Sequence, residues 1–280
     1  MSGALFAVRN VLKAWALLVV ACSILAGLGW LLGGYRLLSI FVFAGALLGA
    51  ALYWTSDRVA LGLLGARELP LAEAPGLHST VERLAALARV LKPRLYLIPD
   101  GLPRAAAVGR GPRGSALAVS SGLLAAATPA ELEAVVAHEL AHVRNRDVIV
   151  QTSVVVLAAT LLEFSRIGGW LQRVLLYLLG PIAAAFVHLM LSRNREFVAD
   201  RDAAVLCDSP HPLADALVRL DAASELVEFA GSPATEPLYT INPFMEDGLA
   251  ALFVTHPPVG ERVRRLRQLD PSWPEKLRAA

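Results

Sequence analysis

The sequence predicts a mainly α protein with a small β-sheet (an α+β fold) combined with about four transmembrane helices. Three observations predict this class: four long apolar runs, a group of short extended segments between residues 94 and 120, and a strongly capped helix that begins after Thr128. Hydrophobic residues make up 56% of the 280 positions and charged residues 18%. Soluble domains are nearer half apolar, so the surplus requires a membrane or a very large core.

Two apolar runs, 11–32 and 37–54, lie near the N-terminus with a short turn at 33–36 between them. About twenty apolar residues cross a bilayer, so both runs are long enough to span one. A cleaved signal peptide is the alternative for the first run, but its apolar part is too long and a second run follows at once. We therefore expect residues 1–57 to form an N-terminal transmembrane hairpin.

Basic residues near the ends of these runs predict an orientation. Arg9 and Lys13 lie at the start of the first run, Arg58 and Arg67 follow the second, and Arg36 alone lies in the turn. By the positive-inside rule, the N-terminus and everything after residue 57 lie in the cytoplasm. The net charge of +2 is too small to indicate a nucleic-acid partner.

The second domain, residues 58–280, begins with a stretch whose composition is that of a soluble protein. Apolar residues at helical spacing predict an amphipathic helix at 76–92. Short strands bounded by Gly and Pro turns follow at 94–98, 104–109 and 115–120. These segments form a small sheet with few polar side chains.

The next helix has a clear start signal. Thr128 suits the N-cap, Pro129 the first helical position and Glu131 the third position of a capping box. We expect this central helix to run to about Arg146.

Two further apolar runs follow, at 148–164 and 170–191. We expect an antiparallel membrane hairpin at about 148–191 that interrupts the second domain and returns the chain to the central helix. A pair of buried core helices is the alternative, and the polar residues Gln151 and Glu163 favour it. The remaining chain predicts a helix at 210–229, a Pro-rich loop at 231–243 and a basic helix at 258–269.

The central helix carries His138, Glu139 and His142, the HExxH pattern of zinc-dependent hydrolases. Side chains at i and i+4 of a helix lie on one face about 6 Å apart, so both imidazoles can bind one metal ion. We expect one Zn²⁺ per chain, which makes its water acidic, with Glu139 as the general base.

Catalytic zinc needs a third protein ligand, often a carboxylate. Glu196 begins a helical stretch where the second hairpin returns, and is the best candidate. Asp200, one turn later, is suited to hold a ligand imidazole in the right tautomer. The alternative for both is a pair of solvated charges opposite nearby arginines.

His256, in the segment Thr255-His256-Pro257-Pro258, is the candidate donor to the oxyanion that forms during attack on a peptide carbonyl. A histidine that caps or packs at the start of the last helix is the equal alternative.

Taken together, these blocks resemble the HtpX-type membrane zinc endopeptidases, relatives of the CAAX prenyl proteases. The resemblance is carried by 103–112 (PRAAAVGRGP), by 133–142 (EAVVAHELAH) and by 195–200 (REFVAD). It implies a gluzincin-like fold, zinc ligation by His138, His142 and Glu196, and catalysis by Glu139. It also implies a multi-pass protein of the bacterial-type inner (plasma) membrane that cleaves misfolded or membrane proteins at the cytoplasmic face. The expected partners are protein or peptide substrates and the lipid bilayer.

One block departs from the family. Where the family usually has Asn-Ala-Phe-Ala-Thr-Gly, residues 104–109 read Arg-Ala-Ala-Ala-Val-Gly, which affects substrate preference rather than zinc binding. By analogy with zinc proteases, we expect an extended substrate to pair by strand addition with Ala116, Leu117, Ala118 and Val119.

Two alternatives to the endopeptidase remain. The first is a CAAX-type protease that acts on prenylated peptides. The second is a non-catalytic membrane scaffold that uses the fold to bind partners.

Overall fold

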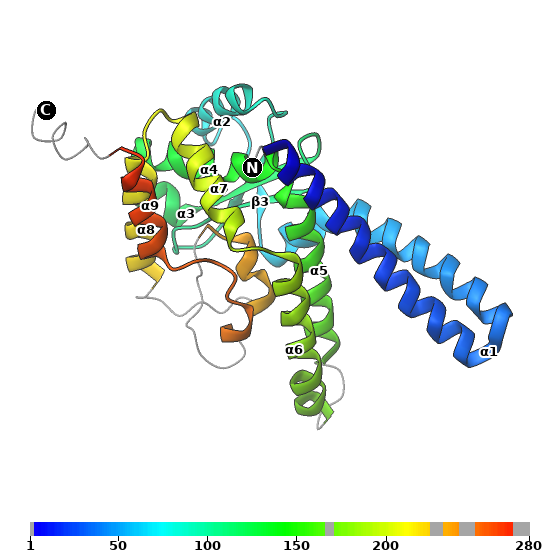
Figure 1. The fold of residues 1–280 in the computed structure, drawn as a ribbon. Helices are drawn as coiled ribbons and strands as arrows, with labels where there is room; N and C mark the ends of the chain where they lie inside the picture. Colours follow the sequence, from blue (N-terminus) through cyan, green and yellow to red (C-terminus); the bar gives the residue numbers. More distant parts are fainter. Residues whose placement is uncertain (1–2, 166–170, 225–231, 241–249, 271–280) are drawn as a thin grey trace, which may run out of the picture.

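The computed structural model describes residues 3–165, 171–224, 232–240 and 250–270 (Figure 1). Its first half contains α1 (Gly3–Leu63), β1 (Arg67–Glu68), α2 (Pro75–Ala88), β2 (Arg94–Ile98), β3 (Ala105–Gly109), β4 (Ser115–Ser120), α3 (Ser121–Ala126) and α4 (Pro129–Arg144). Its second half contains α5 (Asp147–Ser165), α6 (Leu171–Met190), α7 (Asn194–Leu206), α8 (His211–Ser224), the 3₁₀ segments η1 (Pro233–Leu238) and η2 (Ala250–Phe253), and α9 (Val259–Gln268). The predicted mainly α fold with a small sheet is confirmed.

The four strands form one mixed sheet in the order β1-β2-β4-β3. β2 and β4 are parallel, whereas β1 and β3 pair antiparallel with their neighbours. Both faces are covered: Leu117 and Val119 belong to the core shared with α2, α4 and α8, and Ala116 and Ala118 to the core shared with α5 and the end of α1. Covering both faces explains why the strands have few polar side chains.

The sheet order corrects the prediction for residues 116–119. Strand addition needs a free edge, but β4 pairs with β2 on one side and with β3 on the other. Ala116, Leu117, Ala118 and Val119 are all fully buried between these strands. The prediction that they bind substrate by strand addition is therefore wrong, and the edge strands are β1 and β3.

The central helix α4 begins as predicted. Thr128 Oγ1 accepts from the Glu131 N–H at 3.3 Å, and the Glu131 carboxylate accepts from the Thr128 N–H at 2.8 Å. The helix ends at Arg144, two residues before the predicted end, because Asn145 caps it and Arg146 has a φ of 60°. The chain bends by 88° there and continues as α5.

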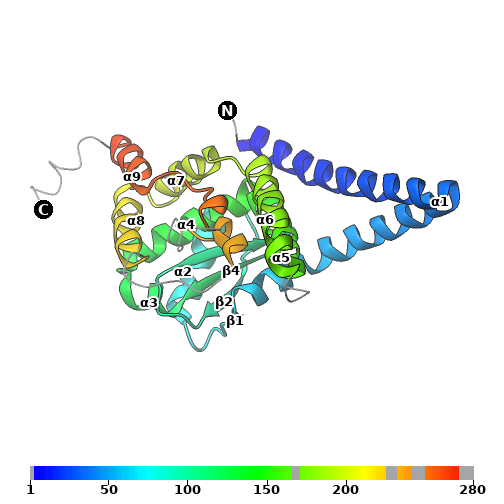
Figure 2. The ribbon, with the colours of Figure 1, turned by 90° about the horizontal axis from the view of Figure 1, so that it is seen from below.

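The long helix α1 is a hairpin whose two arms meet at Gly33 and Gly34, inside the predicted turn (Figures 1 and 2). Gly34 has a φ of 59°, which favours glycine. The arms pack closely, since a Cβ on Gly29 would lie 2.7 Å from the Leu37 carbonyl oxygen. Within the described chain, the stretch Cys22–Ala51 of this hairpin is long and apolar enough to cross a membrane. If each of two bent helix pairs is also counted as one span, the number of candidate spans rises to three.

The second apolar hairpin, α5 and α6, lies beside the sheet (Figure 2). α5 contacts the sheet, η1, α1 and α6, and most of its side chains are buried, as the buried-helix alternative expects. α6 keeps apolar side chains on its surface, including Tyr177, Leu178 and Ile182. The two antiparallel helices return the chain to α4, as predicted.

Other elements differ from the sequence predictions. The helix α2 ends at Ala88, because Arg89 adopts a left-handed backbone conformation that closes the helix. Part of the Pro-rich loop is the 3₁₀ segment η1. Residues 225–229 of the predicted helix, and residues 231 and 241–243 of the predicted loop, lie outside the described residues.

Candidate metal centre and active site

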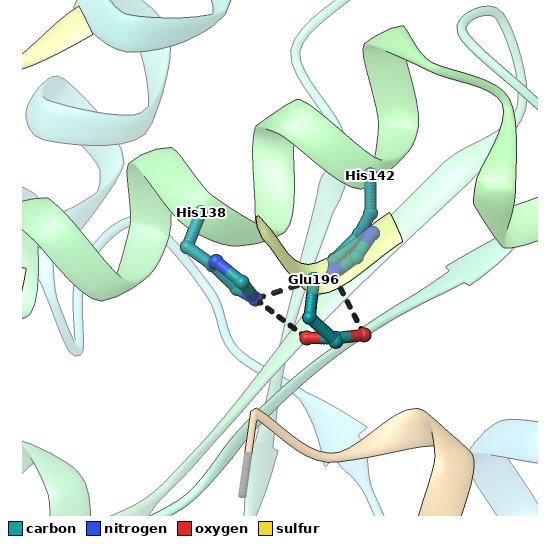
Figure 3. A group of neighbouring side chains, drawn as sticks. All are labelled: His138, His142 and Glu196. Carbon is teal, nitrogen blue, oxygen red and sulfur yellow. Dashed lines mark hydrogen bonds and ion pairs between the residues drawn. The ribbon is translucent and has the colours of Figure 1, made fainter. Parts of the chain in front are cut away.

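Three predicted ligands meet at one point (Figure 3). His138 and His142 lie one turn apart on α4, and their Nε2 atoms are 3.2 Å from each other. Glu196, in the first turn of α7, places Oε2 3.4 Å from His138 Nε2 and Oε1 3.6 Å from His142 Nε2. All three are buried, and their ligand atoms lie within 4.8 Å of one another. α4 and α7 pack side by side, which brings the two halves of the site together.

Two carboxylates set the orientation of the imidazoles. Asp200 Oδ1 lies 3.0 Å from His138 Nδ1, and Asp147 Oδ2 lies 3.0 Å from His142 Nδ1. Ionised carboxylates only accept, so both Nδ1 atoms carry hydrogen and both Nε2 lone pairs point inward. Asp200 thus occupies the place predicted for it. Asp147 was not predicted; its signal was its position five residues after His142, at the start of an apolar run.

The arrangement fits a metal ion. Two Nε2 lone pairs face a buried carboxylate, and among the described residues neither oxygen of Glu196 has a hydrogen-bond donor. A cation between these groups would be attracted by the carboxylate and bound by both Nε2 atoms. Ligands of tetrahedral zinc with bonds of 2.0–2.1 Å are about 3.3 Å apart, close to the 3.2–3.6 Å found here.

A buried arginine holds Asp200 in place. Arg262, on α9, donates to both oxygens of Asp200 at 2.9 and 2.7 Å and to the Thr240 carbonyl oxygen at 2.6 Å. Its Nη2 also lies 3.7 Å from Glu196 Oε2. Arg262 was predicted only as part of a basic helix and its role was missed, although its position between Val259 and Leu266 on the apolar face of that helix was a signal.

Neighbouring charges shift the pKa values of the ligands when no metal is bound. Burial lowers the pKa of His142, but the carboxylates of Glu196 and Asp147 outweigh it and raise that pKa to about 10. Burial likewise opposes ionisation of Glu196, yet His256, His142 and Arg195 hold its pKa well below the usual value. Metal binding must therefore displace a proton from His142.

Glu139 lies between α4 and the edge of the sheet. One carboxylate oxygen accepts from the Ala107 N–H of β3 at 2.8 Å, and the other accepts from the Thr240 hydroxyl at 2.8 Å. Glu139 is therefore buried beside the metal-binding group but is not one of the three converging ligands.

His256 follows η2 and reaches the same site. Its Nε2 lies 3.6 Å from Glu196 Oε1, and its Nδ1 lies 2.8 Å from Glu236 Oε1. Glu236 also accepts from the N–H and hydroxyl of Thr255. The ring thus faces the metal-binding group rather than the start of α9. Glu236 was missed because it lies in the stretch predicted to be a Pro-rich loop.

The segment η1 is held against the helices of the site. Arg195 Nη2 donates to the Pro237 carbonyl oxygen at 3.1 Å, and Gln151 Nε2 donates to the same oxygen. The Arg195 Nε atom lies 3.1 Å from Glu196 Oε1. These contacts connect η1 to α5 and α7, and so keep Glu236 next to the metal-binding group.

This fold and this group of histidines and carboxylates define a metalloprotease. The chain belongs to the family described as Peptidase family M48, which matches residues 71–270. It is 36% identical to a "Protease HtpX homolog" of Pelotomaculum thermopropionicum, with 93% of this chain and 99% of the relative covered. It is 37% identical to that of Persephonella marina (90% and 96% covered) and 36% identical to that of Pyrococcus abyssi (92% and 95%). The crystal structure of S. mikatae Ste24p matches 93% of this chain and 66% of its own with a TM-score of 0.49 and 19% identity. The predicted HtpX-type membership is confirmed.

Proposed function

We propose that this metalloprotease is a zinc-dependent endopeptidase of the membrane, with His138, His142 and Glu196 as its zinc ligands. The observation that carries the proposal is the convergence of two Nε2 lone pairs on a buried carboxylate that has no hydrogen-bond donor among the described residues. When bound, zinc supplies a Lewis acid that makes a water molecule acidic and polarises a peptide carbonyl.

The residues of the chain then have separate roles. Asp200 and Asp147 keep the two imidazoles in the Nδ1–H tautomer. Glu139 accepts the proton of the attacking water and passes it to the leaving amine. His256 is the donor to the oxyanion: Glu236 accepts from its Nδ1–H and so turns its Nε2 toward the metal-binding group.

An extended substrate segment would lie along β3, because this edge strand is next to Glu139. Arg104 precedes this strand and lies over the ring of Tyr239, 5.1 Å from its centroid. The departure from the family at residues 104–109 therefore falls on the strand that would meet the substrate.

The membrane arrangement is part of the proposal. Residues 1–57 form the N-terminal transmembrane hairpin, and residues 58–280 form the protease domain, interrupted by the second hairpin at about 148–191, for about four spans. The distribution of basic residues supports a cytoplasmic protease domain at the plasma membrane. Substrates are misfolded or membrane proteins that present a loose segment close to the bilayer.

The test is a Glu139→Gln variant of the full chain beside the wild type in detergent, with casein and a loosely folded membrane protein as substrates. Both proteins are expected to hold one zinc ion, whereas cleavage by the variant falls 10²–10⁴-fold. Glu133→Gln, on the same helix but paired with the half-exposed Arg83, is the matched control and keeps activity. Equal cleavage by Glu139→Gln and wild type would refute the role of Glu139, and wild type without zinc would refute the metal centre.

A further inference from the structure

The first arm of α1 carries a buried polar side chain that reaches the protease domain. Asn10 is 6% exposed, although the arm it belongs to is mostly apolar. Its Nδ2 donates to Asp147 Oδ1 at 2.5 Å and to the Asn145 carbonyl oxygen at 3.1 Å. The other oxygen of Asp147 lies 3.0 Å from His142 Nδ1. One continuous chain of polar contacts thus runs from the N-terminal arm to a proposed metal ligand.

The chemistry of these contacts fixes their direction. A carboxylate and a carbonyl oxygen only accept, so the side-chain NH₂ of Asn10 must face them, and its two hydrogens match the two acceptors. Both acceptors lie in the turn between α4 and α5, where the chain bends by 88°. A single amide therefore fixes the turn that follows the second histidine of the HExxH motif.

The same arm also contacts the connection that leads to Glu196. Lys13 Nζ donates to the Met190 carbonyl oxygen at 2.7 Å, at the end of α6. Asn10 and Lys13 line a small cavity of about 10 Å³ together with Asp147 and Arg195, the neighbour of Glu196. The arm therefore lies against both chain segments that deliver metal-site residues.

We infer that Asn10 is a positioning residue of the metal centre. It holds the Asp147 carboxylate, which in turn holds the His142 ring with Nε2 toward the metal. The first arm of α1 is thus a part of the site as well as a part of the membrane hairpin. The inference rests on the proposed zinc centre.

The test compares Asn10→Leu with wild type, as full-length protein in detergent. Leucine has a similar size but donates no hydrogen bond. Loss of a residue that binds a ligand imidazole weakens metal binding 10–100-fold. Asn10 contacts Asp147 and not the imidazole itself, so we expect the lower end of this range: Asn10→Leu should release zinc to a chelator about 10-fold faster. Leu12→Ala, in the same turn of the arm and 63% exposed, should stay within about twofold of wild type.

A second measurement separates positioning from general stability. The melting temperature is measured with and without zinc, because ligand binding adds stability that grows with the logarithm of the affinity. In Asn10→Leu the rise caused by zinc should shrink, and the visible spectrum of the Co²⁺-loaded protein should change. Equal zinc release, or an equal fall of both melting temperatures with an unchanged rise, would overturn the inference. If Asn10→Leu does not fold, Asn10→Ser is judged by the same criteria. Wild type that binds no zinc would instead refute the proposed metal centre.

Discussion

The protein contains two apolar hairpins that look alike in sequence and differ in their surroundings. The α1 hairpin projects from the protease domain (Figures 1 and 2). Only 6% of its most apolar part, within Cys22–Ala51, is buried. The α5–α6 hairpin lies against the domain, and α5 buries Val148, Val154 and Val155 completely. Apolar runs of similar length therefore serve different ends: α5 packs within the protein, whereas the α1 hairpin presents an outward apolar surface.

The difference extends to the ends of the hairpins. The second hairpin begins with Asp147 and is followed by Glu196, so each end supplies a residue of the proposed metal centre. The first hairpin meets the domain through Asn10 at one end and through Asp57, which pairs with Arg94 and Arg110, at the other. A hairpin can thus be tied to an active site at its ends, whatever surrounds its middle.

A charge placed in the middle of each hairpin should give the largest contrast. Val154→Asp buries an unpaired carboxylate in α5, which costs several kcal/mol, so the protease domain should not fold in detergent. Phe43→Asp on α1, where the side chain is 72% exposed, should leave the unfolding of the domain unchanged. Thermal unfolding followed by circular dichroism measures both. Similar stability of the two variants would contradict the comparison.

Asp147 and Asp57, the acidic residues at the ends of the two hairpins, should differ in effect: loss of Asp147 should weaken metal binding, and loss of Asp57 should lower stability. Asp147→Ala removes the acceptor for His142 and should weaken zinc binding 10–100-fold. Asp57→Ala breaks two ion pairs far from the ligands and should lower the free energy of unfolding by about 1–3 kcal/mol without changing zinc affinity. Zinc titration and denaturant unfolding of each variant test the pair. A loss of zinc affinity in Asp57→Ala would contradict the prediction that Asp57 acts on stability alone.

The pH dependence of stability should depend on Asp147, at the start of the second hairpin, and not on Asp57. In the metal-free protein the pKa of His142 is raised from 6.5 to about 10. Between these values the folded state binds more protons than the unfolded state, so this contribution to stability is complete below pH 6.5 and is lost as the pH rises toward 10. The melting temperature of the metal-free protein should fall over this range. Asp147→Asn should reduce the fall, and Asp57→Asn, the matched control, should leave it unchanged.

The smallest effect should come from the packing of the two arms of α1. A Cβ at Gly29 would lie 2.7 Å from the Leu37 carbonyl oxygen and 2.9 Å from Phe41 Cβ, whereas one at Gly27 meets nothing within 4 Å. Gly29→Ala should therefore separate the arms at a cost of about 1 kcal/mol, and Gly27→Ala should not. Spin labels at Ser23 and Leu47, in a background without Cys22 and Cys207, measure the separation. Unchanged distances in Gly29→Ala would mean that the arms do not pack as described.

Local signals in the sequence predicted much of this molecule. The capping box at Thr128 set the start of α4, and the spacing of His138 and His142 set one half of the metal centre. The position of Glu196 after a returning hairpin predicted the other half, since two antiparallel helices bring the chain back to its starting side.

The rest depends on packing between distant segments. Glu236 and Arg262 reach the site from η1 and α9, and the residues that they bind there lie far from them in the sequence. The prediction that residues 116–119 pair with substrate was wrong for a related reason. The Gly and Pro turns within residues 94–120 predict strands, but the order β2-β4-β3 depends on a parallel pairing between strands that are not consecutive in the chain.

The edge strand β3 has a consequence for the behaviour of the protein in solution. Its backbone groups at three alternate positions are already bound by side chains: the Ala105 carbonyl by Thr240, the Ala107 N–H by Glu139 and the Gly109 N–H by Thr152. An uncovered edge is a template for pairing with a second copy of the same strand, and hence for aggregation. The side chains of Thr240, Glu139 and Thr152 thus keep an apolar, alanine-rich strand from joining its counterpart in a neighbouring molecule.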